Sequence, residues 1–153
     1  MNLLGKNNFF VEKKYEMRNK KHFINWSNQY QCRPTYVHHP ASTGEARNII
    51  RQAVERKTKI RVFGSGHSPS DIAMSNYDLI CSDRLNQILN INWDSQTIVT
   101  QAGVTLKELS QGLGQHGLAL PNLGSISDQT VGGAIATATP VSYTHLRAHE
   151  TKK

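Results

Sequence analysis

The sequence predicts a mixed α+β fold, and three observations support it. The chain has 153 residues, enough to bury one sizeable core if all of it folds. Two stretches repeat apolar residues at helical spacing behind capping residues. Short β-branched runs lie before and between these stretches and end at turn residues. The order helix, strand, loop, strands, helix and small-residue loop is typical of a mixed helix and sheet domain.

The first predicted helix begins after Ser42. Ser42 and Glu45 have the spacing of a capping box, in which each side chain reaches the other residue's backbone N–H. Apolar residues then recur at helical spacing, which predicts one buried stripe formed by Ala46, Ile49, Ile50, Ala53 and Val54. The charged residues between them are expected to face solvent.

Strands are expected at residues 60–63, 79–81, 88–91 and 97–102, with residues 93–96 as a hairpin connection. A second helix is expected behind Thr105, where Glu108 completes another capping box. Its apolar side would be Leu106, Leu109 and Leu113, and Gly117 is placed to end it.

The net charge of +7 is concentrated at the chain ends. Residues 1–25 carry +4 and residues 141–153 carry +2, whereas residues 26–140 carry only +1. The folded body is therefore not expected to bind nucleic acid, which needs a basic surface. No stretch approaches the roughly 20 apolar residues of a membrane span. Cys32 and Cys81 are interpreted as two separate thiols.

Two segments rich in small residues suit a diphosphate. Residues 64–68, Gly-Ser-Gly-His-Ser, follow a predicted strand, so glycines there would let backbone amides turn toward an anion. Residues 125–133 offer hydroxyls followed by two glycines at a candidate helix start, whose amides would also face an anion. Either segment alone is more typical of a tight turn, and it is the occurrence of both that indicates a diphosphate site. Pro69 stands where a dinucleotide fingerprint needs its third glycine, which excludes the Rossmann pattern.

His67 lies between small residues in a glycine-rich turn rather than on an apolar face. Composition leaves two interpretations open, a hydrogen-bonded loop histidine or a catalytic or ligand-attached imidazole. A metal site is not expected, because His38 and His39 are adjacent and the two cysteines do not have ligand spacing. The motif of a nucleophilic serine, Gly-x-Ser-x-Gly, is also absent around it.

The run Val-Phe-Gly-Ser-Gly-His-Ser-Pro-Ser-Asp-Ile-Ala at residues 62–73 resembles the flavin-attachment loop of the sugar-1,4-lactone oxidases. These enzymes belong to the vanillyl-alcohol-oxidase type of flavoprotein. Asn25-Trp26 and Cys32-Arg33-Pro34 resemble the start of that family's domain, and residues 117–133 resemble its second FAD loop. The resemblance covers residues 23–139.

The resemblance implies a two-subdomain FAD-binding fold of the PCMH type, cut off at its C-terminal side, with FAD between the subdomains. His67 matches the histidine that family members bond covalently to the 8α-methyl carbon of FAD. The other residues that match the cofactor loops are Gly64, Ser65, Gly66, Ser68, Ser70, Ser125, Thr130, Gly132, Gly133 and Thr137. No metal and no catalytic residue of the family falls in this chain.

The implied reaction is oxidation of an L-gulono-, L-galactono- or D-arabinono-1,4-lactone by O2, which gives ascorbate or an analogue and hydrogen peroxide. The chain alone is expected to be inactive. Alternatives are another covalent-FAD oxidase, of the alditol or cytokinin type, or a basic binding module without enzymatic activity. The family implies an intracellular enzyme, with membrane association at the endoplasmic reticulum or mitochondria through parts outside this chain.

The resemblance ends at Thr139. The family continues with a histidine and glycine-rich sequence, whereas Pro140 follows here and residues 141–151 match nothing in it. One reading frame of a common sequencing adapter encodes that string. We therefore interpret residues 1–22 as a flexible basic leader, residues 23–139 as a partial FAD-binding domain and residues 140–153 as a non-native tail.

Genomic DNA of the source, amplified across codon 139, tests the interpretation of the tail. We expect the sequence beyond Thr139 to differ from residues 140–153 and to continue as in the family. Recovery of the same 14 codons from genomic DNA would show that the tail is native.

Overall fold

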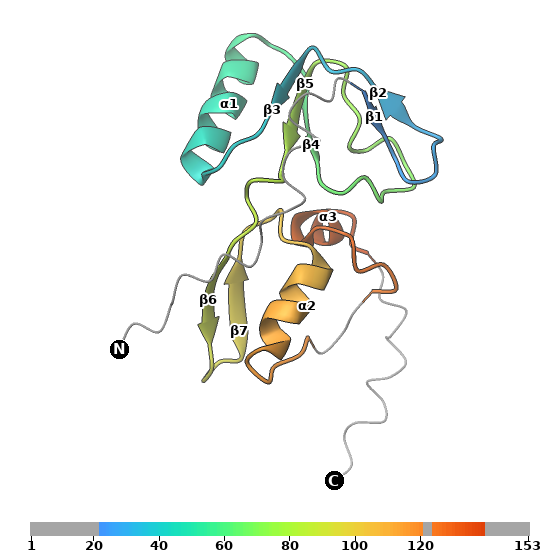
Figure 1. Cartoon of the computed structure of the whole chain (residues 1–153). Helices are drawn as coiled ribbons and strands as arrows, with labels where there is room; N and C mark the ends of the chain where they lie inside the picture. Colours follow the sequence, from blue (N-terminus) through green and yellow to red (C-terminus); the bar gives the residue numbers. More distant parts are fainter. Residues whose placement is uncertain (1–21, 121–123, 140–153) are drawn as a thin grey trace.

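The computed structural model describes residues 22–120 and 124–139. The predicted leader (except His22) and the predicted tail lie outside the described residues. Two lobes follow one another along the chain, a first lobe of residues 22–82 and a second lobe of residues 83–139 (Figure 1). Each lobe has its own cluster of buried apolar side chains.

The first lobe is built on a parallel sheet of three strands. Strands β3 (Tyr36–His38) and β4 (Ile60–Phe63) flank the central strand β5 (Asp78–Cys81). All four residues of β5 are buried, as expected for the middle of a parallel sheet. Two short antiparallel strands, β1 (Phe23–Ile24) and β2 (Gln31–Cys32), precede this sheet. Phe23 packs edge-on against Phe63, which fixes this hairpin over the end of β4.

Helix α1 (Thr43–Glu55) connects β3 to β4. Ser42 accepts a hydrogen bond from the Glu45 amide, but the Glu45 carboxylate accepts from the amide of Ala41 rather than Ser42, so half of the predicted capping box is wrong. The predicted buried stripe is also wrong in part, because only Ala53 is buried while Ile50 and Val54 are 46% and 68% exposed. Apolar spacing shows which residues share a helix face, but the neighbouring elements bury only the part of that face around Ala53.

A buried carboxylate ties α1 to the sheet. Asp78 is fully buried and accepts hydrogen bonds from Arg56 Nη2 and Thr58 Oγ1, both at 2.7 Å. His38 Nε2 lies 2.7 Å from the same carboxylate. Burial alone would raise the pKa of Asp78, but the hydrogen bonds from His38 and Thr58 and the Arg56 charge outweigh it and hold the pKa below its usual value.

The second lobe begins with a hairpin of β6 (Ile88–Asn92) and β7 (Thr97–Thr100). Helix α2 (Leu106–Gly114) buries Leu109 and Leu113 against it, and the predicted capping box of Thr105 and Glu108 is confirmed. Gly117 ends the helical segment as predicted, because it adopts φ +69° while the Leu118 amide donates to the Leu113 carbonyl. A short third helix, α3 (Val131–Ala136), lies where the two lobes meet (Figure 1).

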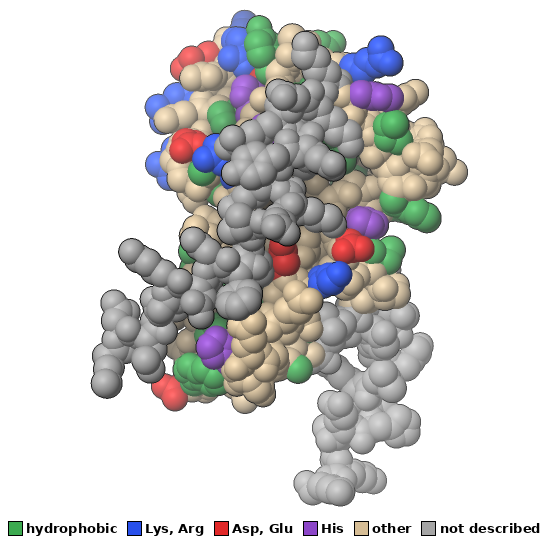
Figure 2. Space-filling view, in the orientation of Figure 1, with side chains coloured by type: hydrophobic (Ala, Val, Ile, Leu, Met, Phe, Trp, Pro, Cys, Tyr) green, Lys and Arg blue, Asp and Glu red, His purple; other side chains and the backbone are tan. Residues whose placement is uncertain are grey.

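The surface shows no continuous basic area on the face drawn in Figure 2. Lys and Arg side chains lie mainly over the first lobe there, interspersed with acidic and apolar ones. Cys32 and Cys81 are both buried and form no disulfide, so the prediction of separate thiols is confirmed. Among the described residues, no helix has the length and apolar character needed to cross a bilayer, and no cluster of three or more potential metal ligands occurs.

Replacement of Asp78 by Asn in the full-length polypeptide is expected to lower the free energy of unfolding by about 3 kcal/mol, because Arg56 and Thr58 lose a charged acceptor. Since the pKa of Asp78 is lowered in the folded state, its contribution is fully present above about pH 4 and is lost as the pH falls through the folded-state pKa. Urea denaturation between pH 3 and 6 measures both effects. The exposed Asp94→Asn variant is the control, and an equal loss there would contradict the assignment.

Candidate functional site

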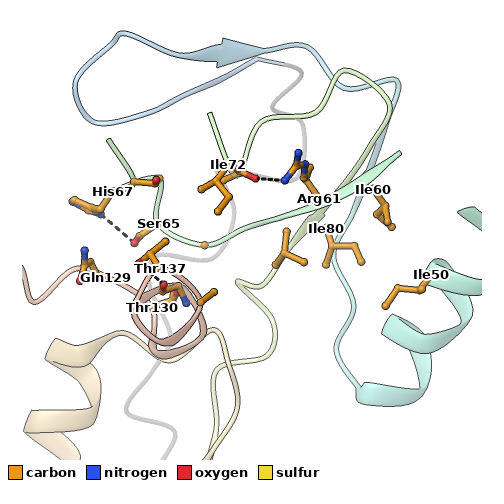
Figure 3. Close-up of a pocket in the computed structure, with 17 residues that line it drawn as sticks. Ile50, Ile60, Arg61, Ser65, His67, Ile72, Ile80, Gln129, Thr130 and Thr137 are labelled. Atoms are coloured by element: carbon orange, nitrogen blue, oxygen red, sulfur yellow. Dashed lines mark hydrogen bonds between the residues drawn. The ribbon is translucent and has the colours of Figure 1, made fainter. Parts of the chain in front are cut away.

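A pocket of about 380 Å³ lies where the loop after β4 faces α3 (Figure 3). Its volume falls within the usual range of small-molecule sites. The first lobe supplies Gly64, Ser65, Gly66, His67 and Ser68 at its polar end, and Ile50, Ile60, Arg61, Val62, Ile72, Ala73 and Ile80 elsewhere. The second lobe supplies Gln129, Thr130, Gly133, Ala136 and Thr137. Both predicted cofactor segments therefore reach one pocket.

The backbone of residues 64–68 has unused hydrogen-bond donors. None of its five N–H groups donates to an acceptor within the described part of the chain. Gly66 adopts φ +74°, and a Cβ there would lie 2.8 Å from the Phe63 ring, so the turn needs a glycine. A run of free N–H groups beside a pocket is a typical anion-binding arrangement.

Asn25 holds this loop in place. Its side chain is 2% exposed and donates to the Ser68 carbonyl at 3.1 Å, while the Trp26 amide donates to the Gly66 carbonyl at 3.0 Å. The Asn25 side-chain carbonyl in turn accepts from the Tyr30 amide. The carbonyl groups of Gly66 and Ser68 thereby face the β1–β2 hairpin, and the N–H groups of the loop are not used in binding that hairpin.

His67 is half-buried and lines the pocket. Its Nδ1 lies 3.1 Å from the Ser65 hydroxyl, and its Nε2 makes no hydrogen bond within the described residues (Figure 3). One ring nitrogen is therefore oriented by the protein and the other is available to a ligand. This arrangement is chemically suited to a nucleophilic or hydrogen-bonding imidazole.

The second segment contributes differently from the sequence expectation. Thr130 caps α3, as its Oγ1 accepts from the Gly133 amide at 3.2 Å. The amides of Val131 and Gly132 donate to Val104 and Ala102, and that of Ala134 donates to Thr130. All of the N–H groups at the start of α3 are thus used within the protein. The expectation that these amides face an anion is wrong, because pairing with residues 102–104 consumes two of them.

Gly64 and Thr130 bring the two lobes close together beside the pocket. A Cβ on Gly64 would collide with Thr130 Oγ1 and would also lie 3.4 Å from its Cβ and Cγ2 atoms. Gly64 is not among the residues with positive φ, so it is needed for space rather than for backbone conformation. The two lobes can therefore approach this closely beside the pocket because residue 64 is a glycine.

Three of the predicted residues do not line the pocket. Ser70 is exposed and its hydroxyl pairs with that of Ser68 at 3.1 Å, and Ser125 is exposed. Gly132 packs against the second lobe, where a Cβ would lie 2.9 Å from the Cβ of Ala102. The pocket does contain the other predicted residues, namely Gly64, Ser65, Gly66, His67, Ser68, Thr130, Gly133 and Thr137.

Gln129 is a pocket residue that sequence reasoning missed. Its side-chain oxygen is buried and has no hydrogen-bond partner within the described part of the chain, which is a costly state unless a ligand supplies a donor. Its neighbours in sequence gave no signal, because a single amide between Asp128 and Thr130 resembles any polar loop residue. Asn25 belongs to a motif of the sequence resemblance, but its contact with the Ser68 carbonyl, 43 residues away in sequence, could not be predicted from that motif.

The residues present fit a flavin nucleotide. The N–H groups of residues 64–68, which have no acceptor within the described residues, suit the negative charge of a diphosphate. Gly64 has no side chain, so its backbone stays accessible from the pocket beside Thr130. Gln129 offers a side-chain oxygen that can accept a hydrogen bond. The apolar side chains of Ile60, Ile72 and Ile80 provide surface for flat, uncharged parts of such a ligand.

Comparison with known proteins agrees with this class of site. Residues 34–146 match the model of the family described as "FAD binding domain", which covers most of the chain. The chain belongs to this family of flavin-binding proteins. The sequence resemblance stated above is thereby confirmed.

The curated relatives are sugar-lactone oxidases. The chain is 40% identical over 117 residues to L-gulonolactone oxidase of Mus musculus, with 76% of this chain and 27% of that protein covered. It is 41% identical over 121 residues to D-arabinono-1,4-lactone oxidase of Eremothecium gossypii, with 76% and 23% covered. The chain therefore spans about a quarter of the length of these relatives.

Solved structures share the fold. A solvent-stable cholesterol oxidase matches with a TM-score of 0.68 and 24% identity, over 76% of this chain and 23% of that one. An alkyldihydroxyacetonephosphate synthase matches with a TM-score of 0.59 and 25% identity, over 65% and 20%. The predicted FAD-binding fold of the PCMH type is confirmed.

Gly64→Ala in the full-length polypeptide is expected to lower the free energy of unfolding by about 1–3 kcal/mol, because the new methyl group collides with Thr130. In a Thr130→Ala background the same substitution should cost less, and a double-mutant cycle by urea denaturation measures the difference.

Gly114→Ala is the matched control for this cycle. Nothing lies within 4 Å of a Cβ at Gly114, so this substitution is expected to be neutral or stabilising by up to about 1 kcal/mol. Equal costs for Gly64→Ala with and without Thr130 would show that the two lobes do not meet in this way.

Proposed function

We propose that this chain is the N-terminal part of an FAD-dependent oxidase that acts on an aldono-1,4-lactone. The single observation that supports it most is the run of five N–H groups at residues 64–68, that of His67 included, which have no acceptor within the described residues and lie at a pocket between two lobes. The lactone oxidases among the relatives, at about 40% identity, support the substrate class.

The residues of the chain have distinct roles in this proposal. The amides of residues 64–68 bind the diphosphate. The Asn25 side chain and the Trp26 amide hold this loop through the carbonyls of Ser68 and Gly66, respectively. Thr130 and Thr137 close the pocket from the second lobe, and Gln129 accepts a hydrogen bond from the cofactor. When bound, FAD supplies the acceptor for a hydride taken from the lactone.

His67 is the proposed point of covalent attachment. It lies in the pocket, its Nε2 is unpaired, and its ring is oriented through Nδ1. A bond to the 8α-carbon of FAD would prevent the cofactor from dissociating from this pocket, whose lining comes from both lobes.

The substrate in this proposal is an L-gulono-, L-galactono- or D-arabinono-1,4-lactone, with O2 as the final acceptor. The product would be ascorbate or an analogue, with hydrogen peroxide. The residues that bind the lactone and remove its proton would lie in the parts of the enzyme beyond this chain. The enzyme would be intracellular, and any attachment to a membrane would reside in those parts too.

Acid precipitation of the full-length protein tests the role of His67. We expect a precipitate with flavin fluorescence from the unaltered protein and background fluorescence from His67→Ala, because the only covalent bond to FAD has been removed. His116→Ala is the control, since His116 is exposed and contacts Trp93 in the second lobe. Free flavin in all three supernatants would remove His67 from this role.

Oxygen consumption with the three lactones tests the substrate class in the same samples. We expect uptake of O2 with at least one lactone and production of an equal amount of hydrogen peroxide. Uptake with an alditol or a cytokinin instead of any lactone would point to another oxidase with covalent FAD.

A further inference from the structure

The hydroxyl of Ser65, a residue that lines the pocket, contacts His67. Its Oγ lies 3.1 Å from His67 Nδ1, although the sequence resemblance grouped Ser65 with the residues that surround the diphosphate. Figure 3 shows Ser65 between His67 and the α3 residues, with this hydrogen bond drawn. The side chain is therefore already engaged on the imidazole that faces the cofactor site.

The other hydroxyls around the pocket have different partners. Ser68 pairs with Ser70, Thr130 accepts from the Gly133 amide, and Thr137 donates to the Gly133 carbonyl at 2.9 Å. Among the described residues, Ser65 alone places a hydroxyl on the ring of His67. The i to i+2 contact is made across Gly66, whose positive φ turns the chain between them.

We propose that Ser65 is a positioning residue for covalent attachment of the flavin, and that it acts through His67 rather than on the diphosphate. This inference rests on the proposed function, since it requires that His67 is the attachment point. A neutral imidazole has one N–H and one lone pair, and attack on carbon needs the lone pair. The Ser65 hydroxyl can accept from an Nδ1–H or donate to an unprotonated Nδ1, and in either case it holds the ring against rotation with Nε2 toward the pocket.

The attachment reaction is balanced with O2 as oxidant. One bond forms between an imidazole nitrogen of His67 and the 8α-carbon of FAD, and one N–H and one C–H bond break. The two protons and two electrons released pass to O2, which becomes hydrogen peroxide. Ser65 is unchanged at the end, as expected of a residue that only orients the reacting group.

The experiment follows attachment with time in the full-length protein, made by cell-free translation without flavin and then mixed with FAD in air. Samples are quenched in acid and the fluorescence of the precipitate is measured. We expect Ser65→Ala to attach FAD about tenfold more slowly, as loss of one hydrogen bond to a reacting group implies. Ser65→Thr keeps the hydroxyl and should remain within about threefold of the unaltered rate.

A second measurement separates positioning from cofactor binding. In the His67→Ala background no bond forms, so the Kd of FAD can be measured by fluorescence titration. Addition of Ser65→Ala should change this Kd by less than about twofold, whereas loss of a hydroxyl bound to phosphate would weaken it about tenfold or more. Ser95→Ala, whose hydroxyl pairs with Thr97 in the β6–β7 turn, is the control for both measurements.

The outcomes distinguish the positioning role of Ser65 from the attachment of FAD at His67. Slow attachment by Ser65→Ala, rescue by Ser65→Thr and an unchanged Kd support the inference. Equal rates for Ser65→Ala and the unaltered protein, or a Kd weakened in proportion to the rate, overturn it while His67 keeps its role. No covalent flavin in the unaltered protein would overturn the proposed attachment at His67 and this inference together.

Discussion

The backbone of residues 64–68 ends a strand without entering another regular element, and the rest of the site depends on how it is held. Asn25 and Trp26 bind its carbonyl groups, so the N–H groups are left without acceptors next to the pocket. Unpaired amides at a protein surface are tolerated because water can bind them, and a diphosphate can replace that water. The position of His67, the contact of Gly64 with Thr130 and the opening of the pocket all follow from this fixed loop.

The two lobes contribute unequally to the site. The first lobe supplies the free amides and the imidazole, whereas the second lobe uses its own helix-start amides to pair α3 with residues 102–104. That pairing makes α3 a rigid wall, with Thr130 buried at its start. In this geometry the first lobe supplies the groups suited to an anion, and the second lobe supplies the opposite side of the pocket together with the side-chain oxygen of Gln129.

The sequence was informative where the signal is local. The capping box of Thr105, the turn at Gly117 that follows α2 and the strand of Asp78–Cys81 depend on residues within a few positions of each other. The loop of residues 64–68 was found because a rare motif stands there. The buried side of α1 was overestimated, since amphipathic spacing says which residues share a face but not how wide the opposing sheet is.

The site could be predicted only in part, because its remaining features depend on distant pairings. The N–H groups at the start of α3 donate to residues 102–104, which lie about 30 positions away in sequence. No local sequence pattern predicts these hydrogen bonds. The role of Asn25 depends on Ser68, and the orphan oxygen of Gln129 depends on the packing around it. Hydroxyl-rich sequence at Ser70 and Ser125 suggested ligand contacts that the pocket does not include.

The order of the two lobes along the chain has a consequence for synthesis on the ribosome. His67 emerges before Thr137, and about 70 residues separate them, which takes roughly 4–14 s at ordinary elongation rates. The parallel sheet and the loop held by Asn25 lie wholly within the first lobe, so they can form during that interval. The pocket exists only once α3 has emerged, and until then the loop of residues 64–68 lacks the residues that face it from the second lobe.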